Sequence, residues 1–236
     1  MATNSILILG LARSGTTSLG KGLAHQGVGE FVGEPWRSNR LKYKENSSSI
    51  FFDYIKEAIN IVLKSIITHV PYAYDRPTPL DFYKYLISIF GIENTILITR
   101  KNLDEHVDSR MHLRYKSLLK DKYKPLEEAG KSYINKHAAH VPYRSSFTPK
   151  SFLQNRKERQ MVIDYTIQER KVMFELSKLY NKDIVWYEDL YGNDRDLSLK
   201  IINSWTFKDF EIDCIQLNEY LDPKYKYNKS NFDKLI

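Results

Sequence analysis

A short segment near the start of the chain contains residues that could hold an anion. Gly10 and Gly15 enclose a polar turn that carries Arg13, and Thr16 and Thr17 follow the second glycine. Glycine is required where a backbone turns tightly or comes close to a ligand. Backbone N–H groups, hydroxyls and a cation gathered in one turn can cradle a phosphate. The spacing predicts a phosphate-binding loop, and the alternative is a tight turn that binds no ligand.

The segments on either side of this turn have the patterns of a strand and a helix. Residues 6–9 form an apolar run typical of a buried strand, and Leu19, Leu23 and Ala24 recur at helical spacing. A helix that begins at the turn points the positive end of its dipole at a bound anion. The order of strand, glycine loop and helix therefore supports the phosphate interpretation.

The loop departs from the G-x-x-x-x-G-K-[ST] pattern that binds nucleoside triphosphates. Thr16 occupies the lysine position, and the cation of the loop is Arg13 instead. A triphosphate site loses a contact to its β- and γ-phosphates by this change, whereas arginine suffices for a less highly charged group. The sequence also offers no apolar strand that ends in the aspartate expected to help hold Mg²⁺. Both observations disfavour a P-loop nucleotide or small-molecule kinase, which stays as an alternative.

Other side chains capable of chemistry follow predicted strands. His69 ends the segment 65–69, and Arg100 and Lys101 follow the strand predicted for residues 95–99, with Ser109 further along. Ligands of open α/β sheets lie beyond the carboxyl ends of the strands. We therefore expect these groups to surround one pocket together with the loop.

Strands and helices alternate along the chain, which argues for a parallel sheet covered on both faces. The patterns predict helices over residues 50–63, 79–91, 103–119, 154–180 and 194–205, and strands over residues 65–69, 95–99 and 183–186. We expect one α/β domain over residues 1–236, with a helical insertion or lid around residues 120–150.

Four motifs of the chain resemble those of the sulfotransferases that use 3′-phosphoadenosine 5′-phosphosulfate (PAPS). Residues 10–17, G-L-A-R-S-G-T-T, resemble the 5′-phosphosulfate loop, especially the P-R-S-G-T-T form of the tyrosylprotein and bacterial enzymes. Residues 67–71, I-T-H-V-P, are similar to the K-T-H-x-P of the cytosolic enzymes. Residues 96–100 with Ser109 resemble the arginine and serine of the 3′-phosphate site, and residues 186–190, W-Y-E-D-L, resemble a late Y-E-D-L.

The resemblance implies a three-layer P-loop-type fold, with a central parallel β-sheet flanked by helices, and sulfuryl transfer from PAPS to a hydroxyl or amine acceptor. The residues implied for binding PAPS are Arg13, Ser14, Gly15, Thr16, Thr17, Ser18, Arg100, Lys101 and Ser109. No metal is expected, because a transferred sulfuryl group carries less negative charge than a phosphoryl group, for which a metal ion neutralises the developing charge. The motifs leave the acceptor open: a sugar, a lipid, a peptide or a small alcohol.

Two residues are candidates for the base that activates the acceptor. His69 corresponds to the catalytic histidine of K-T-H-x-P, and its flanking residues also match. Glu34 lies 21 residues after Arg13, a spacing similar to that of the glutamate base in tyrosylprotein sulfotransferases. We favour His69 slightly. Ile67 replaces the lysine of K-T-H, which leaves Arg13 as the catalytic cation at the leaving oxygen.

The 3′-phosphate motif departs from the family pattern in its spacing. The serine normally lies eight residues after the arginine, where this chain has Asp108, whereas Ser109 lies eight residues after Lys101. Either the register shifts by one residue at Arg100, or Lys101 shares the role of the arginine. The sequence leaves both alternatives open.

Composition limits the possible partners and the location. The net charge of +7 attracts polyanions, but the lysines are spread along the chain, which favours a local anion site over a nucleic-acid-binding arm. The single cysteine, Cys214, excludes an internal disulfide and a cysteine-rich zinc site and fits a reducing compartment. No apolar run approaches the ~20 residues that cross a bilayer, and no signal peptide is recognisable, so we expect a cytoplasmic protein. A non-catalytic module that binds anions or RNA is the second alternative.

Overall fold

The computed structural model describes residues 5–33, 60–67, 79–112, 156–208 and 211–222. It divides into two compact units. The first unit comprises residues 1–101 and 169–236, and the second comprises residues 102–168. Every strand of the described residues belongs to the first unit.

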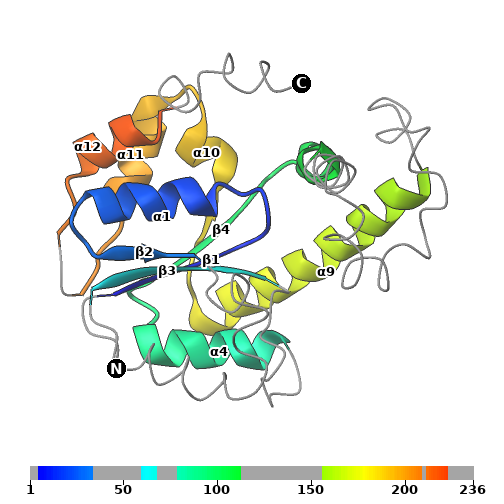
Figure 1. Ribbon diagram of the computed structural model, residues 1–236, viewed down its shortest axis with the longest axis horizontal. Coiled ribbons are helices and arrows are strands. Elements are labelled where there is room, and N and C mark those ends of the chain that lie inside the picture. Colours follow the sequence, from blue (N-terminus) through cyan, green and yellow to red (C-terminus); the bar gives the residue numbers. More distant parts are fainter. Residues whose placement is uncertain (1–4, 34–59, 68–78, 113–155, 209–210, 223–236) are drawn as a thin grey trace, which may run out of the picture. The chain divides into compact units, whose positions relative to one another are not determined.

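The first unit is built on a five-stranded sheet in which every pairing is parallel (Figure 1). The strands are β1 (Ile6–Gly10), β2 (Glu30–Val32), β3 (Ile61–Ile66), β4 (Thr95–Thr99) and β5 (Ile184–Trp186), in the order β2-β3-β1-β4-β5. The helices are α1 (Thr16–His25), α4 (Pro79–Phe90), α9 (Arg156–Tyr180), α10 (Tyr187–Tyr191), α11 (Arg195–Asn203) and α12 (Cys214–Tyr220). The predicted three-layer α/β class, with a central parallel sheet flanked by helices, is confirmed.

The apolar side chains of the central strand serve two separate cores, because successive residues of a strand point to opposite faces. Ile6 and Ile8 of β1 pack with α1, α11 and α12. Leu7 and Leu9 pack with α4 and with the C-terminal part of α9. A parallel strand buried on both faces consists of a continuous apolar run, and this explains why residues 6–9 predicted a strand so clearly.

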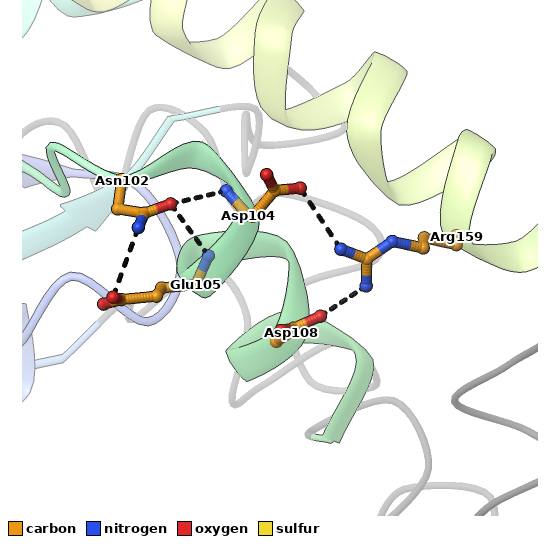
Figure 2. A network of polar contacts seen from close by, with 5 residues as sticks. All are labelled: Asn102, Asp104, Glu105, Asp108 and Arg159. Atoms are coloured by element: carbon orange, nitrogen blue, oxygen red, sulfur yellow. Dashed lines mark hydrogen bonds and ion pairs between the residues drawn. The ribbon is translucent and has the colours of Figure 1, made fainter.

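The second unit contains a helix that begins at residue 103 and is described to residue 112, together with the first part of α9. Asn102 caps this helix, because its Oδ1 atom accepts the backbone N–H groups of Asp104 and Glu105 at 3.0 and 3.2 Å. Arg159 of α9 donates to the carboxylate of Asp104 at 3.2 Å (Figure 2). These contacts determine where the helix begins and join it to α9.

Asp108, which stands where the family pattern has serine, has a structural role within this second unit. Its carboxylate accepts a hydrogen bond from Arg159, in the same network as Asp104 (Figure 2). Buried Val107 and Met111 pack against Val162 of α9. The residue at the expected serine position thus helps to hold two helices together.

Most predicted elements are confirmed within the described residues. Helices occur at residues 79–90, 103–112, 156–180 and 195–203, and strands occur at residues 95–99 and 184–186. Gly91, with φ 83°, ends α4 as predicted, and its N–H donates to the carbonyl of Ile87 at 2.8 Å. The insertion predicted around residues 120–150 lies outside the described residues. No helix among the described residues is long and apolar enough to cross a membrane.

The helix predicted for residues 50–63 is wrong at its C-terminal end. Residues 61–63 belong to β3, which lies between β1 and β2, and residues 50–59 lie outside the described residues. A short apolar run such as Ile61, Val62 and Leu63 suits either a buried strand or a buried helix, and pairing with two neighbouring strands decides between them. The strand predicted for residues 65–69 therefore begins earlier, at Ile61, and ends at Ile66. β2, α10 and α12 were not predicted.

Replacement of Leu97 by alanine tests the core beneath the sheet. Leu97 on β4 is 0 % exposed, whereas Leu179 near the end of α9 is 56 % exposed. We expect Leu97→Ala to lower the free energy of unfolding by about 2–5 kcal/mol through lost burial and a residual cavity. The matched control Leu179→Ala should change it by no more than about 0.5 kcal/mol. Urea denaturation followed by circular dichroism measures both, and equal effects would contradict the central place of β4.

Candidate anion-binding site

The loop between β1 and α1 has a constrained backbone. Arg13 has φ 72° and Gly15 has φ 78°, so both residues are in the left-handed region. That conformation costs a residue with a side chain about 1–2 kcal/mol, and strain of this kind is concentrated at functional sites. The N–H of Ser14 donates to the carbonyl of Leu11 at 3.2 Å and closes the turn. The loop is therefore a defined turn, held in one conformation.

The first turn of α1 presents backbone N–H groups at the carboxyl end of β1. Gly15 is the N-cap, no side chain caps the helix there, and the first turn contains no acidic residue. The first N–H groups of a helix have no partner within the helix, and they carry the positive end of the helix dipole. This end of α1 is suited to an anion.

The two glycines are required by close contacts, and not only by the turn. A Cβ atom on Gly10 would lie 2.3 Å from Cγ2 of Thr16 and 2.9 Å from the carbonyl oxygen of Ile98. A Cβ atom on Gly15 would lie 2.4 Å from Cε2 of Tyr191. Larger residues at either position would force the loop away from its neighbours.

Two tyrosines of α10 hold the loop in place. The hydroxyl of Tyr191 donates to the carbonyl of Gly15 at 2.8 Å. The ring of Tyr187 lies 4.7 Å, between centroids, from that of Tyr191. Tyr191, directly after the Y-E-D-L segment, therefore supports the loop, and Tyr187 of that segment packs beside it. Neither tyrosine was predicted to have a role; their spacing of four residues, directly after a strand, is the signal that could have identified them.

Arg100 connects the end of β4 to the loop. Its Nε donates to the carbonyl of Arg13 at 3.0 Å. Its guanidinium lies 4.1 Å from the centroid of the Tyr187 ring, in a cation–π contact. Two arginines that are 87 residues apart in the chain thus meet at one edge of the sheet, as expected for residues at the carboxyl ends of adjacent strands.

Lys101 has a different environment, because two carboxylates of α10 hold it. Its ammonium pairs with Asp189 at 2.6 Å, and its backbone N–H donates to Glu188 at 2.8 Å. The pair of carboxylates therefore positions the chain after β4.

Arg170 of α9 also holds this segment, through hydrogen bonds to its backbone carbonyls. It donates to the carbonyl of Arg100 and, at 2.9 Å, to that of Lys101. Burial lowers the pKa of Arg170, and the nearby Glu188 carboxylate acts in the opposite direction. A guanidinium stays protonated in proteins, so Arg170 adds a permanent positive charge close to the end of β4.

Lys64 brings a further cation to the loop. It lies on β3, and its ammonium donates to the hydroxyl of Thr17 in the first turn of α1 at 3.3 Å. Lys64 was not predicted as a site residue, because it lies between the helix predicted to end at residue 63 and the strand predicted to begin at residue 65. Lysine within an otherwise apolar strand is the signal that could have identified it.

Three buried hydroxyls lie on or beside the strands that meet at the loop. They belong to Ser14 in the loop, Ser65 on β3 and Thr99 on β4, and they have no hydrogen-bond partner among the described residues. All three residues are 0 % exposed. Buried polar groups are nearly always hydrogen-bonded, so these hydroxyls suit a region that receives a polar ligand.

The structure brings together some of the predicted site residues. Arg13 and Thr17 are exposed, Ser14 and Thr16 are buried, and Gly15 and Ser18 are half-buried, all in the loop or the first turn of α1.

The other predicted site residues lie elsewhere. Arg100 meets the loop directly, whereas Lys101 is held by α10. Ser109 is half-buried in the second unit. Both candidate bases, His69 and Glu34, lie outside the described residues.

Comparison with known proteins yields no relative. No protein-family model matches the sequence, and neither a curated protein nor a solved structure matches the chain. In the described part of the chain, no group of three or more His, Cys, Asp and Glu side chains is arranged to hold a metal ion. The loop and its neighbours are therefore the features from which a function can be inferred.

Replacement of Gly15 by alanine tests the contact between the loop and α10. Gly27 is a matched control, because its φ of 77° is nearly that of Gly15 at 78°, yet a Cβ atom on Gly27 would meet nothing within 4 Å. In both variants the left-handed backbone at the alanine lowers the free energy of unfolding by about 1–2 kcal/mol. We expect Gly15→Ala to lose roughly 1–3 kcal/mol more than Gly27→Ala, because it also displaces Tyr191. Urea denaturation measures the difference in free energy of unfolding between the two variants. Equal values would show that Tyr191 is not in close contact with the loop at residue 15.

Proposed function

We propose that the protein transfers a sulfuryl group from PAPS to a hydroxyl or amine acceptor. The observation that carries the proposal is the 3.0 Å hydrogen bond from Arg100 to the carbonyl of Arg13, which joins the loop to the end of β4. Three of the four motifs that resemble the family contact one another, since Arg100 bonds to the loop and lies over the ring of Tyr187 in the Y-E-D-L segment. Tyr191, the residue after that segment, bonds to the carbonyl of Gly15. Chance matches scattered along a chain would have no reason to meet at one edge of a sheet.

The loop is the proposed site of the 5′-phosphosulfate. The N–H groups of the first turn of α1, the side chain of Arg13 and the hydroxyls of Thr16, Thr17 and Ser18 are of the kind that bind such a group. The buried hydroxyl of Ser14, which has no partner among the described residues, fits a ligand oxygen. These several donors suit an anion whose negative charge is shared among several oxygen atoms.

We assign the 3′-phosphate to Arg100 in preference to Lys101. Lys101 already has a counter-ion in Asp189 at 2.6 Å. Arg100 contacts a carbonyl and an aromatic ring, and neither of these neutralises its charge. A guanidinium also presents several donors in a plane, which suits a phosphate.

The proposed reaction needs one base and one group of donors at the leaving oxygen. The acceptor oxygen bonds to sulfur while the bond from sulfur to the bridging phosphate oxygen breaks, and the acceptor proton passes to His69 or Glu34. Arg13 and the N–H groups of α1 stabilise the charge that develops on the leaving 5′-phosphate. 3′-Phosphoadenosine 5′-phosphate (PAP) is then released.

Binding of PAP tests the proposal without knowledge of the acceptor. A ligand that binds only the folded state stabilises it by about 2.7 kcal/mol at a hundredfold excess over Kd. We expect PAP to raise the melting temperature by several degrees, and ADP and Mg·ATP to raise it much less. Differential scanning fluorimetry at equal ligand concentrations measures the three shifts. A response to Mg·ATP alone would replace the proposal with a kinase, and a response that falls steeply with salt and ignores the 3′-phosphate would indicate a non-catalytic anion- or RNA-binding module.

Separate replacement of His69 and Glu34 by alanine identifies the base. Loss of a general base lowers kcat by about 10²–10⁴-fold, while PAP affinity should stay unchanged because the base acts on the acceptor. We expect His69→Ala to show this loss, measured as PAP release from PAPS with a panel of alcohol, phenol, sugar and amine acceptors. The pH profile is an independent readout, since an imidazole base loses activity below about pH 6.5 and a carboxylate base below about pH 4.3. Retention of full kcat by His69→Ala would transfer the role to Glu34.

A further inference from the structure

The peptide group between Arg100 and Lys101 lies just beyond the sheet. β4 ends at Thr99, which pairs with Trp186 at the end of the register with β5. Beyond a strand, the ladder of hydrogen bonds no longer fixes the backbone, and each buried C=O and N–H needs another partner. The orientation of this peptide therefore depends on the groups that its two polar atoms meet.

Side chains of opposite charge hold the two polar atoms of this peptide. Its carbonyl, that of Arg100, accepts a hydrogen bond from the guanidinium of Arg170 on α9. Its N–H, that of Lys101, donates to the carboxylate of Glu188 on α10 at 2.8 Å. Hydrogen bonds in which one partner is ionised are stronger than neutral ones. One peptide plane is thus fixed from two helices.

The charge of Arg170 is directed at the backbone. Within the described residues, the hydrogen bonds of its guanidinium go to the carbonyls of Arg100 and, at 2.9 Å, of Lys101, and none goes to a carboxylate. The side chain is half-buried, and a buried charge is unfavourable unless polar groups surround it. An arginine in this position therefore holds two successive carbonyls at the end of β4.

A fixed peptide gives the Arg100 side chain a defined direction. The plane of the peptide determines ψ of Arg100, and the side chain then extends to the loop. There its Nε donates to the carbonyl of Arg13 at 3.0 Å, and its guanidinium lies 4.1 Å from the centroid of the Tyr187 ring. Rotation of the peptide would displace a charge at the end of a long side chain, and displacements of about 1 Å weaken specific interactions strongly.

We infer that Arg170 is a positioning residue, which orients Arg100 toward the 3′-phosphate of the nucleotide. This inference rests on the proposed function, and it adds a residue that none of the four motifs contains. Because Arg170 acts through Arg100, its effect should be confined to ligands that carry a 3′-phosphate.

Arg170→Met, which removes the donors, tests the inference by isothermal titration calorimetry. The probes are PAP and adenosine 5′-phosphate, which lacks only the 3′-phosphate. We expect PAP affinity to fall by about tenfold, because the charge-assisted hydrogen bond from Arg100 to the phosphate loses its geometry. Affinity for adenosine 5′-phosphate should change by less than about twofold. Lys171→Met is the matched control, since Lys171 is the next residue of α9, is exposed and carries the same charge. It should leave both affinities within about twofold.

A double variant separates positioning from an independent contribution. Arg100→Met alone should weaken PAP binding by about tenfold to a hundredfold. If Arg170 acts through Arg100, the addition of Arg170→Met should weaken it by no more than about a further twofold. Circular dichroism shows whether each variant is folded. Arg170→Gln, whose amide is too close to the backbone to replace the guanidinium, takes the place of Arg170→Met if that variant does not fold, and the same selective loss is expected.

Several results would overturn the inference and leave the proposed function in place. They are unchanged PAP affinity in the folded variant of Arg170, equal losses for the two probes, additive losses in the double variant, and a similar loss in Lys171→Met. Loss of the fold in both Arg170 variants would mark Arg170 as a structural residue and would also overturn the inference. Failure of the unmodified protein to bind PAP would overturn the proposed function as well.

Discussion

The candidate site depends on close packing at two glycines of the loop between β1 and α1. A Cβ atom would lie 2.3 Å from Thr16 at Gly10 and 2.4 Å from Tyr191 at Gly15, so the loop backbone rests directly on its neighbours. The contact at Gly15 lets α10 reach the loop, where Tyr191 bonds to the Gly15 carbonyl and Tyr187 lies beneath Arg100. One steric constraint thus positions residues from three distant parts of the chain.

The cations around this edge of the sheet differ in what surrounds them. Lys101 is paired with Asp189, and Arg170 bonds to backbone carbonyls. Arg100 contacts a carbonyl and an aromatic ring, and Lys64 contacts a hydroxyl. Like charges gathered in one place raise the local potential, and a multivalent anion lowers the energy of such a group. The nucleotide that we propose as ligand would place one anionic group at the loop and another at the end of β4.

The packing around Thr16 accounts for the absence of a lysine at that position of the loop. Thr16 is 3 % exposed and packs against Gly10, so a lysine at that position would have to leave this contact. A cation on the adjacent strand β3 reaches the first turn of α1 from the face of the sheet, without disturbing the loop. The positive charge therefore comes from β3, whereas the tight contact between Gly10 and Thr16 belongs to the loop and the start of α1.

Local sequence patterns determined the strand at residues 6–9, the glycine loop, the helix after it and the stop of α4 at Gly91, because each depends on neighbouring residues alone. They also placed Arg13 and Arg100 after the ends of predicted strands. Only the tertiary structure decided that residues 61–63 form a strand, since an apolar run of that length suits either element until its neighbours pair with it. The tertiary structure likewise showed that Lys64 reaches Thr17 and that the tyrosines of α10 hold Gly15 and Arg100. These contacts depend on strand order and register, which side-chain periodicity does not specify.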